Sequence, residues 1–396
     1  MINGRQIAPL SYALVTFLFC AYVFGFAPAP FLLLLLVFFF IAAGDALTLL
    51  LTKILRRAAL LDRPNQRSMH VIPVPRGGGW SYVILLTLGF GLALSCGFVQ
   101  HLTHYDVRAL LNGSHPLGNI GQCINLDSQT LLLFAGFLVL ALVSWRDDCA
   151  GVPARYRLLA QISAVALPLY SYPVGVLFPD WVPESVAFFL VLFGWVWFLN
   201  LYNFMDGIDG ITASETFFIS AGLALVALKV LADSWILNDL VLILSLVLCS
   251  VSIGFLHYNW HPARIFLGDV GSVTIGYILG FCLLHIAALG YWHIALTLPL
   301  YYLADSGLTL GRRILNREKI WEAHRTHLYQ IAAQASGRHD TVVLKIMACN
   351  TILVIIALAS LFWGAWICLA APLPVVILYL HFAKQARSVY LSIWQS

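Results

Sequence analysis

Five short polar segments carry almost all the side chains that could do chemistry. The most informative segment reads NLYNFMDGIDG over residues 200–210. If a helix continued through it, Asn200, Asn203, Asp206 and Asp209 would recur every three residues along one face. The end of a purely structural helix has little need for four such groups. We therefore expect this stripe to bind a polar ligand.

Carboxylates mark two further segments. Asp147 and Asp148 are adjacent, and Asp269 stands among glycines in FLGDVGS, ten residues after Asn259. Neighbouring carboxylates repel each other and favour a cation or a proton, and Mg²⁺ with phosphate ligands is a fitting partner. The structural alternatives are a solvated helix end for Asp147-Asp148 and a helix N-cap for Asp269.

Glycine and basic residues dominate the two remaining segments. The first contains PVPRGGG at residues 73–79, where consecutive glycines that open a helix allow close backbone approach to a phosphate. Its alternative is a basic anchor loop with a glycine-rich turn. The last, 311–341, contains HRTHLYQ at residues 324–330, whose two histidines could bind metal, hold a phosphate or transfer a proton.

Taken together, these side chains suit phosphoryl transfer. Carboxylates would hold Mg²⁺, cations would hold phosphates and glycines would permit close approach. Catalysis of this kind depends mostly on positioning and on charge neutralisation. The groups lie beside apolar segments, so one substrate is expected to be a lipid phosphate held among helices.

The elements that must position these residues are membrane helices. The chain has 396 residues, of which 61% are hydrophobic and 10% charged, whereas soluble domains carry about 25% charged residues. The apolar runs lie near 8–26, 31–55, 78–99, 129–145, 157–178, 185–203, 211–232, 239–258, 271–289, 291–310, 342–361 and 363–382. Runs of this length without strand alternation predict helices. We predict one all-α polytopic transmembrane bundle, residues 1–396, of about 11–12 helices, with the count uncertain by one at the 289–291 junction.

Positive charge predicts the orientation. If residues 53–77 are cytoplasmic, strict alternation places every Lys and Arg except Arg108 and Lys229 on that side. The predicted cytoplasmic active-site loops are then 56–77, 146–156, 203–210, 259–270 and 311–341, and 100–128 is an external loop. The basic balance needs no nucleic acid to explain it. We interpret the first apolar run as a retained anchor rather than a cleaved signal peptide.

From about Asp62 to Gln330 the chain resembles the polyprenyl-phosphate N-acetylhexosamine-1-phosphate transferases. This family includes the bacterial phospho-N-acetylmuramoyl-pentapeptide transferase and the enzymes that initiate O-antigen, enterobacterial common antigen and teichoic acid linkage units. All five polar motifs occur in family order. The resemblance implies a Mg²⁺-dependent enzyme, with Mn²⁺ as an alternative ion, in the bacterial inner membrane. Its substrates would be undecaprenyl phosphate and a UDP-N-acetylamino sugar, and a homodimer is left open.

The resemblance also implies residue roles. Asp147 is the base or the carboxylate that positions the lipid phosphate, with Asp148 beside it, and Asp269 is the principal Mg²⁺ ligand. Asp147 is a second candidate ligand, and His324 and His327 hold the diphosphate or the sugar. The predicted substrate-binding residues are Asn200, Asn203, Asp206, Gly207, Asp209, Asn259, Phe266, Arg76 and Arg325.

Two departures from the family pattern matter. HRTHLYQ lacks the triple histidine of the peptidoglycan enzyme, which argues against a muramoyl-pentapeptide substrate and favours the O-antigen-initiating branch. Its sugar would be an N-acetylamino sugar such as GlcNAc, QuiNAc or FucNAc. Asp45, inside the second apolar run, has no counterpart in the motifs, and we expect it to form an interhelical hydrogen bond.

Other functional classes fit less well. A transporter or lipid flippase would place polar groups near the bilayer midplane, on broken helices of repeated halves. Here the polar groups lie at helix ends and no repeat is visible. A CDP-alcohol phosphotransferase would share the DGIDG stretch but needs downstream Arg and paired Asp residues that are missing. Within the transferase mechanism, a one-step transfer and a route through an aspartyl-phosphate both remain open.

Overall fold

The structure is a computed structural model that describes residues 29–64, 72–104, 120–230, 240–318 and 326–394. This part of the chain is almost entirely helical. Eight of its helices are long and apolar enough to cross a membrane. The prediction of an all-α polytopic membrane bundle is confirmed. The first predicted span, 8–26, lies outside the described residues.

The elements follow in chain order with short connections. They are α2 (Ala29–Arg57), β1 (Leu61–Asp62), β2 (Val74–Pro75), α3 (Trp80–His104), α5 (Ile120–Ala150), α6 (Ala154–Leu169), η2 (Val174–Leu177), α7 (Glu184–Phe204), α8 (Ile211–Val230), α9 (Leu240–Asn259), α10 (Asp269–Ile286), η4 (Ala287–Tyr291), α11 (Trp292–Thr297), α12 (Leu300–Leu315), α13 (Leu328–Ser336), α14 (His339–Trp363), η5 (Ala365–Ala370) and α15 (Pro372–Trp394).

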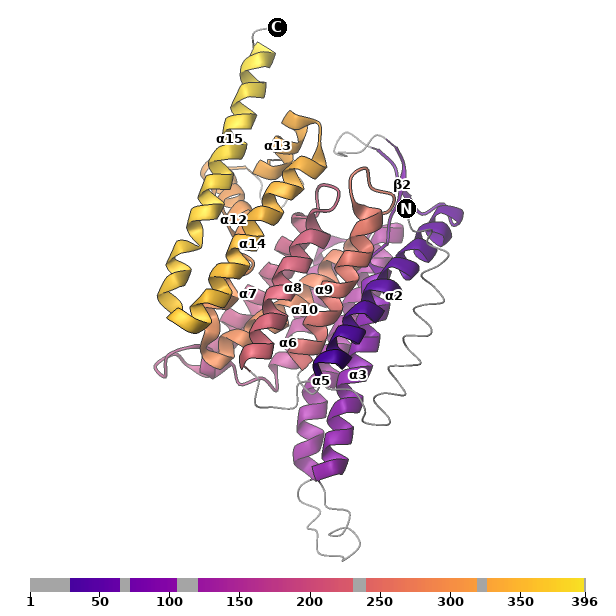
Figure 1. The fold of residues 1–396 in the computed structure, drawn as a ribbon, viewed down its shortest axis with the longest axis vertical. Helices are drawn as coiled ribbons and strands as arrows, with labels where there is room; N and C mark the ends of the chain where they lie inside the picture. The colour runs from indigo at the N-terminus through magenta and orange to yellow at the C-terminus, as the bar shows by residue number, and fades with distance from the viewer. Residues whose placement is uncertain (1–28, 65–71, 105–119, 231–239, 319–325, 395–396) are drawn as a thin grey trace, which may run out of the picture.

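Helices α8, α9 and α10 form the centre of the bundle, with α2 and α3 on one side and α14 and α15 on another (Figure 1). Most of the apolar length of these central helices is buried inside the protein. Small residues allow close helix contact: a Cβ on Gly254 of α9 would lie 2.5 Å from the backbone nitrogen of Asp45 in α2. Because lipid supplies no hydrophobic force between helices, such close packing is what holds them together.

The predicted spans need correction after α10. Residues 291–310 do not form one span. The α10 helix continues through a kink at Gly290, where φ is 92°, and ends as α11 at Thr297. A new helix, α12, begins after Pro299 and carries Asp305, Arg312 and Arg313. The predicted boundary at residue 290 is thus a kink within one helix, whereas the break at Pro299 lies at a position that an apolar average cannot locate. The predicted 100–128 loop is also too long, because α3 extends to His104 and α5 begins at Ile120.

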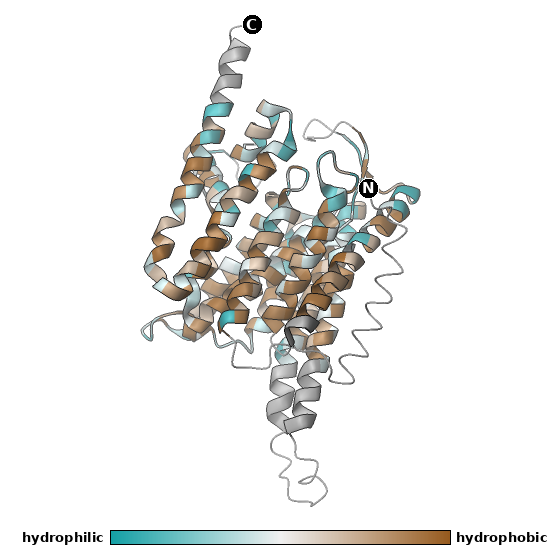
Figure 2. Cartoon of the chain, in the orientation of Figure 1, coloured by the Kyte–Doolittle hydropathy of each residue, from teal (hydrophilic) through white to brown (hydrophobic). Residues whose placement is uncertain are grey.

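Polar residues gather at one end of the bundle. The connections that follow α2, α5, α7 and α9, together with α13, lie at the upper end in Figure 1. In Figure 2 the middle of the bundle is hydrophobic and this end is richer in hydrophilic residues. The five polar segments of the sequence therefore share one face of the protein.

Asp45 lies on α2, beside the end of α9. Its carboxylate is 2.6 Å from Nδ1 of His257 and accepts a hydrogen bond from the Tyr258 hydroxyl at 3.3 Å. This confirms the expected interhelical hydrogen bond and gives Asp45 a structural role.

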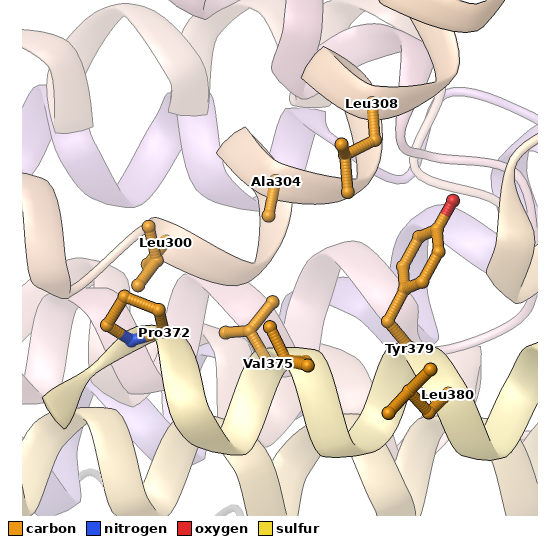
Figure 3. A pocket seen from close by; sticks show the side chains of 8 residues that line it. Leu300, Ala304, Leu308, Pro372, Val375, Tyr379 and Leu380 are labelled. Atoms are coloured by element: carbon orange, nitrogen blue, oxygen red, sulfur yellow. The ribbon is translucent and has the colours of Figure 1, made fainter.

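An apolar groove of about 160 Å³ lies between α12 and α15 (Figure 3). Its lining is Leu300, Ala304, Leu308, Pro372, Val375, Val376, Tyr379 and Leu380. It contains no charged side chain. We interpret it as a lipid-facing hollow between two loosely packed helices.

Candidate active site

The glycine-rich segment pairs with the loop that precedes α10. Phe266 N donates to Pro75 O at 2.8 Å, and Gly78 N and Gly79 N donate to the carbonyls of Phe266 and Leu267 at 2.9 and 2.8 Å. The N–H groups of Gly78 and Gly79 are therefore already hydrogen-bonded and are not free to bind phosphate. This differs from the expectation from the sequence. A Cβ on Gly79 would collide with the backbone of Gly271. The close approach that these glycines allow is between α3 and α10.

Asp148 stabilises the start of α10. Its two carboxylate oxygens accept hydrogen bonds from the backbone N–H groups of Asp269 and Val270, each at 3.0 Å. A carboxylate at this position satisfies N–H groups that the helix leaves unpaired and interacts favourably with the helix dipole. Gly268, with φ 76°, permits the contact, because a Cβ there would lie 2.7 Å from Asp148 Oδ2. The side chain is only 2% exposed, so this geometry favours a positioning role for Asp148 over a catalytic one.

Two arginines join the three carboxylates. Arg76 lies 2.8 Å from Asp148 (Nε to Oδ1) and 2.7 Å from Asp269 (Nη2 to Oδ1). Arg157 Nη1 lies 2.8 Å from Asp147 Oδ2 and 3.6 Å from Asp269 Oδ2. We call Asp147, Asp148, Asp269, Arg76 and Arg157 the carboxylate cluster. Both arginine side chains are more than one third exposed, so incoming anions can reach them.

The carboxylate cluster fits a Mg²⁺ ion. Mg²⁺ prefers oxygen ligands and is usually held by one or two carboxylates together with substrate phosphates and water. Asp269 and Asp147 are 16% and 11% exposed, in contrast to Asp148. Asp147 Oδ1 also accepts the N–H of Val152 at 2.6 Å, which fixes its orientation. Asp269 and Asp147 are thus the more exposed carboxylates of the cluster, and a bound ion would share their oxygens with the two arginines.

The polar stripe of residues 200–210 is interrupted. Helix α7 ends at Phe204, and the chain then turns through Gly210, whose φ is 79°. The condition under which Asp206 and Asp209 would continue the helical face is not met, because α7 ends at Phe204. Asn200, within α7, exchanges hydrogen bonds with Gln161 of α6 at 2.8 and 3.1 Å. Asn203 accepts a bond from the Ser272 hydroxyl at 2.6 Å, next to the start of α10.

Asp206 and Gly207 form the turn between α7 and α8. Burial raises the pKa of Asp206 to about 6, although a hydrogen bond from Thr212 opposes this shift. Gly207 lies against α13, where a Cβ would meet the Tyr329 hydroxyl and Gln330 Nε2. The Tyr329 hydroxyl donates to Met205 O at 3.0 Å. Helix α13 is therefore docked on this turn, and a larger side chain at position 207 would displace it.

Asp209 and Asn259 bond to other parts of the chain. Asn259 accepts the N–H of Gly210 at 3.0 Å and donates to Ile265 O at 2.9 Å. Asp209 Oδ2 lies 2.6 Å from His261 Nδ1 and 3.3 Å from His339 Nδ1. Both side chains are at most 8% exposed. They hold the α7–α8 turn to the 259–268 loop and to α14.

The histidine motif is described only in its second half. His324 and Arg325 lie outside the described residues. His327 precedes α13 and is 4% exposed, with Nδ1 3.9 Å from Asp305 Oδ1. Asp305 also accepts the N–H of Leu328 at 3.2 Å. Phe266, predicted to line the nucleotide site, is half-buried in the loop that pairs with Arg76.

Three residues at these contacts were absent from the predicted site. Arg157 binds two carboxylates of the cluster, and His261 and His339 flank Asp209. Each has a signal in the sequence: Arg157 follows Asp147 by ten residues, His261 follows Asn259 by two residues, and His339 lies in the 311–341 segment. Hydrogen bonds and ion pairs among described residues therefore join all five polar segments.

The chain is similar in sequence to one family model and to several known proteins. Residues 130–287 match the family described as glycosyl transferase family 4. The chain is 26% identical over 318 residues to a probable undecaprenyl-phosphate N-acetylglucosaminyl 1-phosphate transferase of Bacillus subtilis, covering 75% of this chain and 77% of that protein. It is 28% identical over 229 residues to a decaprenyl-phosphate N-acetylglucosaminephosphotransferase of Mycolicibacterium smegmatis, covering 55% and 51%. A phospho-N-acetylmuramoyl-pentapeptide-transferase of Carboxydothermus hydrogenoformans is 30% identical over 186 residues, covering 40% and 55%.

Proposed function

We propose that the chain, whose residues 130–287 match glycosyl transferase family 4, transfers an N-acetylamino-sugar-1-phosphate from a UDP-sugar to undecaprenyl phosphate. UMP is the second product. One observation carries the proposal: Asp147, Asp269, Arg76 and Arg157, from three separate polar segments, meet at one end of a membrane bundle. A lipid phosphate at the membrane surface and a water-soluble nucleotide sugar could both reach that end.

The proposed chemistry is an in-line displacement. An oxygen of the lipid phosphate attacks the sugar-bearing β-phosphorus, the bond from that phosphorus to the bridging oxygen breaks, and UMP leaves with the electron pair. Arg76 and Arg157 neutralise phosphate oxygens as charge moves toward the leaving group. Phosphate monoesters are largely ionised near neutral pH. Asp147 therefore orients the attacking phosphate through Arg157 rather than removing a proton.

The bound metal would be Mg²⁺, with Mn²⁺ as the alternative, held by Asp269 and Asp147 together with substrate phosphates. When bound, it supplies positive charge that polarises the phosphoryl oxygens. Asp148 keeps the backbone of Asp269 in place through its contact with the start of α10. Asn203, near the end of α7, and Asp206, on the turn that follows, are the candidates for contact with the nucleotide.

The physiological setting is part of the same proposal. The relatives from Bacillus and Mycolicibacterium are named for N-acetylglucosamine, so UDP-N-acetylglucosamine is the first donor to test. We propose that the protein lies in a bacterial inner membrane with this end in the cytoplasm. There it would begin the synthesis of O-antigen or a related surface polysaccharide.

The test is UMP release from purified protein in detergent with Mg²⁺, undecaprenyl phosphate and a panel of UDP-N-acetylamino sugars. We expect release that needs the lipid and stops when the metal is chelated. We expect it to fall by a factor of about 10²–10³ in Asp269→Asn. Asp180→Asn, an exposed residue between α6 and α7, is the matched control. Continued turnover without lipid, beyond one UMP per chain, or equal activity in Asp269→Asn, would contradict the proposal.

The same assay separates the two mechanisms. A one-step transfer leaves no labelled protein when UDP-sugar carrying a labelled β-phosphate is supplied without lipid. A covalent phosphoprotein formed under those conditions would establish the two-step route. Uptake of the lipid or sugar into vesicles without UMP release would instead support a transporter.

A further inference from the structure

A second group of metal-ligand side chains lies outside the carboxylate cluster. Asp209 from the α7–α8 turn, His261 from the loop after α9 and His339 at the start of α14 each direct one donor atom to a common point. These three atoms lie within 4.8 Å of one another. The two imidazole rings face each other with their centroids 4.5 Å apart. We propose that Asp209, His261 and His339 form a binding site for a divalent first-row transition metal ion such as Zn²⁺.

The donor atoms converge on one carboxylate oxygen, which each histidine approaches through Nδ1. His339 Nδ1 lies 3.3 Å from Asp209 Oδ2, a separation that an imidazole N–H can bridge when no metal ion is bound. A divalent cation would take the place of that proton, because imidazole binds a metal ion through its unprotonated nitrogen. His261 Nδ1, at 2.6 Å from the same oxygen, adds a third donor.

The distances suit a small ion. Zn²⁺ binds imidazole nitrogen at about 2.0–2.1 Å and carboxylate oxygen at about 2.0–2.2 Å, usually with four ligands in a tetrahedron. Donor atoms in such a tetrahedron are about 3.4 Å apart. The separation of His339 Nδ1 from Asp209 Oδ2 already matches this value. His261 would need to move outward by less than about 1 Å.

Burial and donor type distinguish this site from the carboxylate cluster. Asp209 and His339 are 8% and 6% exposed, whereas the His261 side chain is 29% exposed and leaves a path for the ion. Two imidazole nitrogens and one oxygen select transition ions over Mg²⁺, which prefers oxygen ligands. With three protein ligands, one coordination position stays open for water or another small ligand. The bound ion would tie the α7–α8 turn to α14 and to the loop before α10.

Metal binding tests the proposal without any substrate, so the result does not depend on the transferase activity. Tag-free full-length protein in detergent is stripped with a chelator and titrated with Co²⁺, followed by visible absorption. We expect one Co²⁺ per chain with a tetrahedral spectrum, displaced by Zn²⁺ but not by excess Mg²⁺. His261→Ala and His339→Ala should each weaken Co²⁺ binding by at least about 10-fold, since each removes a ligand. His257→Ala, which alters an exposed histidine paired with Asp45, should leave binding unchanged.

A measurement on the unmodified protein covers the case in which a variant fails to fold. X-ray absorption of the Zn²⁺-loaded chain should show two imidazole ligands and oxygen ligands at about 2.0–2.1 Å. Fewer than two imidazoles, displacement by Mg²⁺, no stoichiometric binding, or unchanged affinity in folded His261→Ala and His339→Ala would each overturn the site. In that case the three side chains act only as a hydrogen-bonded pin for the turn.

Discussion

Adjacent carboxylates can have different roles although their types are identical. Asp147 is partly accessible and pairs with Arg157, whereas Asp148 is buried and bonds to the first N–H groups of α10. The sequence identified the pair but could not separate the two roles. The difference depends on Gly268 and Arg76, which come from distant parts of the chain.

The two hydrogen bonds of the Asn259 side chain should contribute measurably to the stability of the protein. Replacing it with alanine leaves the N–H of Gly210 and the carbonyl of Ile265 without their partner. Each unsatisfied buried group costs about 1–3 kcal/mol, so Asn259→Ala should lower the free energy of unfolding by roughly 2–6 kcal/mol. Thermal unfolding in detergent measures the change, with the exposed Asn316→Ala as the control. Equal melting temperatures for the two variants would refute the role given to Asn259.

The buried Asp206 carboxyl should make the stability of the protein depend on pH. Burial raises its pKa to about 6 from an ordinary value near 4. An acid whose pKa is raised by folding favours the folded state when protonated, so its contribution is present below the unfolded pKa and is lost as pH rises to about 6. Relative to the wild type, Asp206→Asn should therefore become more stable as pH increases from 4 to 6. Above pH 7 the difference in stability between the two proteins should be constant.

Melting temperatures of both proteins across this pH range, in metal-free buffer, provide the measurement. Asp180→Asn controls for effects of pH on the whole protein, because Asp180 lies in an exposed connection. A difference between Asp206→Asn and the wild type that does not change with pH would show that the Asp206 carboxyl is solvated.

At the scale of elements, Gly79 and Gly91 differ in how closely they are packed. Gly79 directly precedes α3, and Gly91 lies within it. A Cβ on Gly79 would collide with the backbone of Gly271, while a Cβ on Gly91 would meet nothing within 4 Å. Gly79→Ala should therefore separate α3 from α10 and reduce stability by about 1–3 kcal/mol or more. Gly91→Ala should be neutral or slightly stabilising, since alanine is a better helix former by about 1 kcal/mol.

Thermal unfolding of these two variants provides the comparison, together with UMP release. The start of α10 carries Asp269, so Gly79→Ala should lose activity along with stability. If Gly79→Ala retained the wild-type melting temperature, the close crossing of α3 and α10 would be wrong.

Much of the element order followed from hydropathy alone. Long apolar runs gave the helices, and the polar segments gave the end of the bundle at which side chains converge. The predicted span boundary at residue 290 is a kink within a helix that continues to Thr297, and the break at Pro299 was missed, since an average over twenty residues does not register one residue. The partners of Asp209 were missed for a different reason. His261 and His339 are 52 and 130 residues away in sequence, and only tertiary packing brings them to one carboxylate.

At the scale of the whole molecule, every connection at the polar end contributes to one network. Arg76 reaches Asp148 and Asp269, Asn259 reaches Gly210, and Tyr329 reaches Met205. A bundle that gathers its charged groups at one end needs that end in water, because a charged side chain within the bilayer costs several kcal/mol. Lys and Arg favour the cytoplasmic side, which predicts that the network faces the cytoplasm.

Thiol labelling at the two ends tests this orientation. Cys149 is exposed and adjacent to Asp148, and Trp181, at the opposite end between α6 and α7, is 81% exposed. In a protein whose other cysteines are replaced, a membrane-impermeant maleimide should label Cys149 in inverted vesicles and not in intact spheroplasts. A Trp181→Cys variant that lacks Cys149 should show the reverse. Labelling of Cys149 from outside would place the network away from the cytoplasm, where UDP-sugars are made, and the proposed transfer reaction would lose its donor.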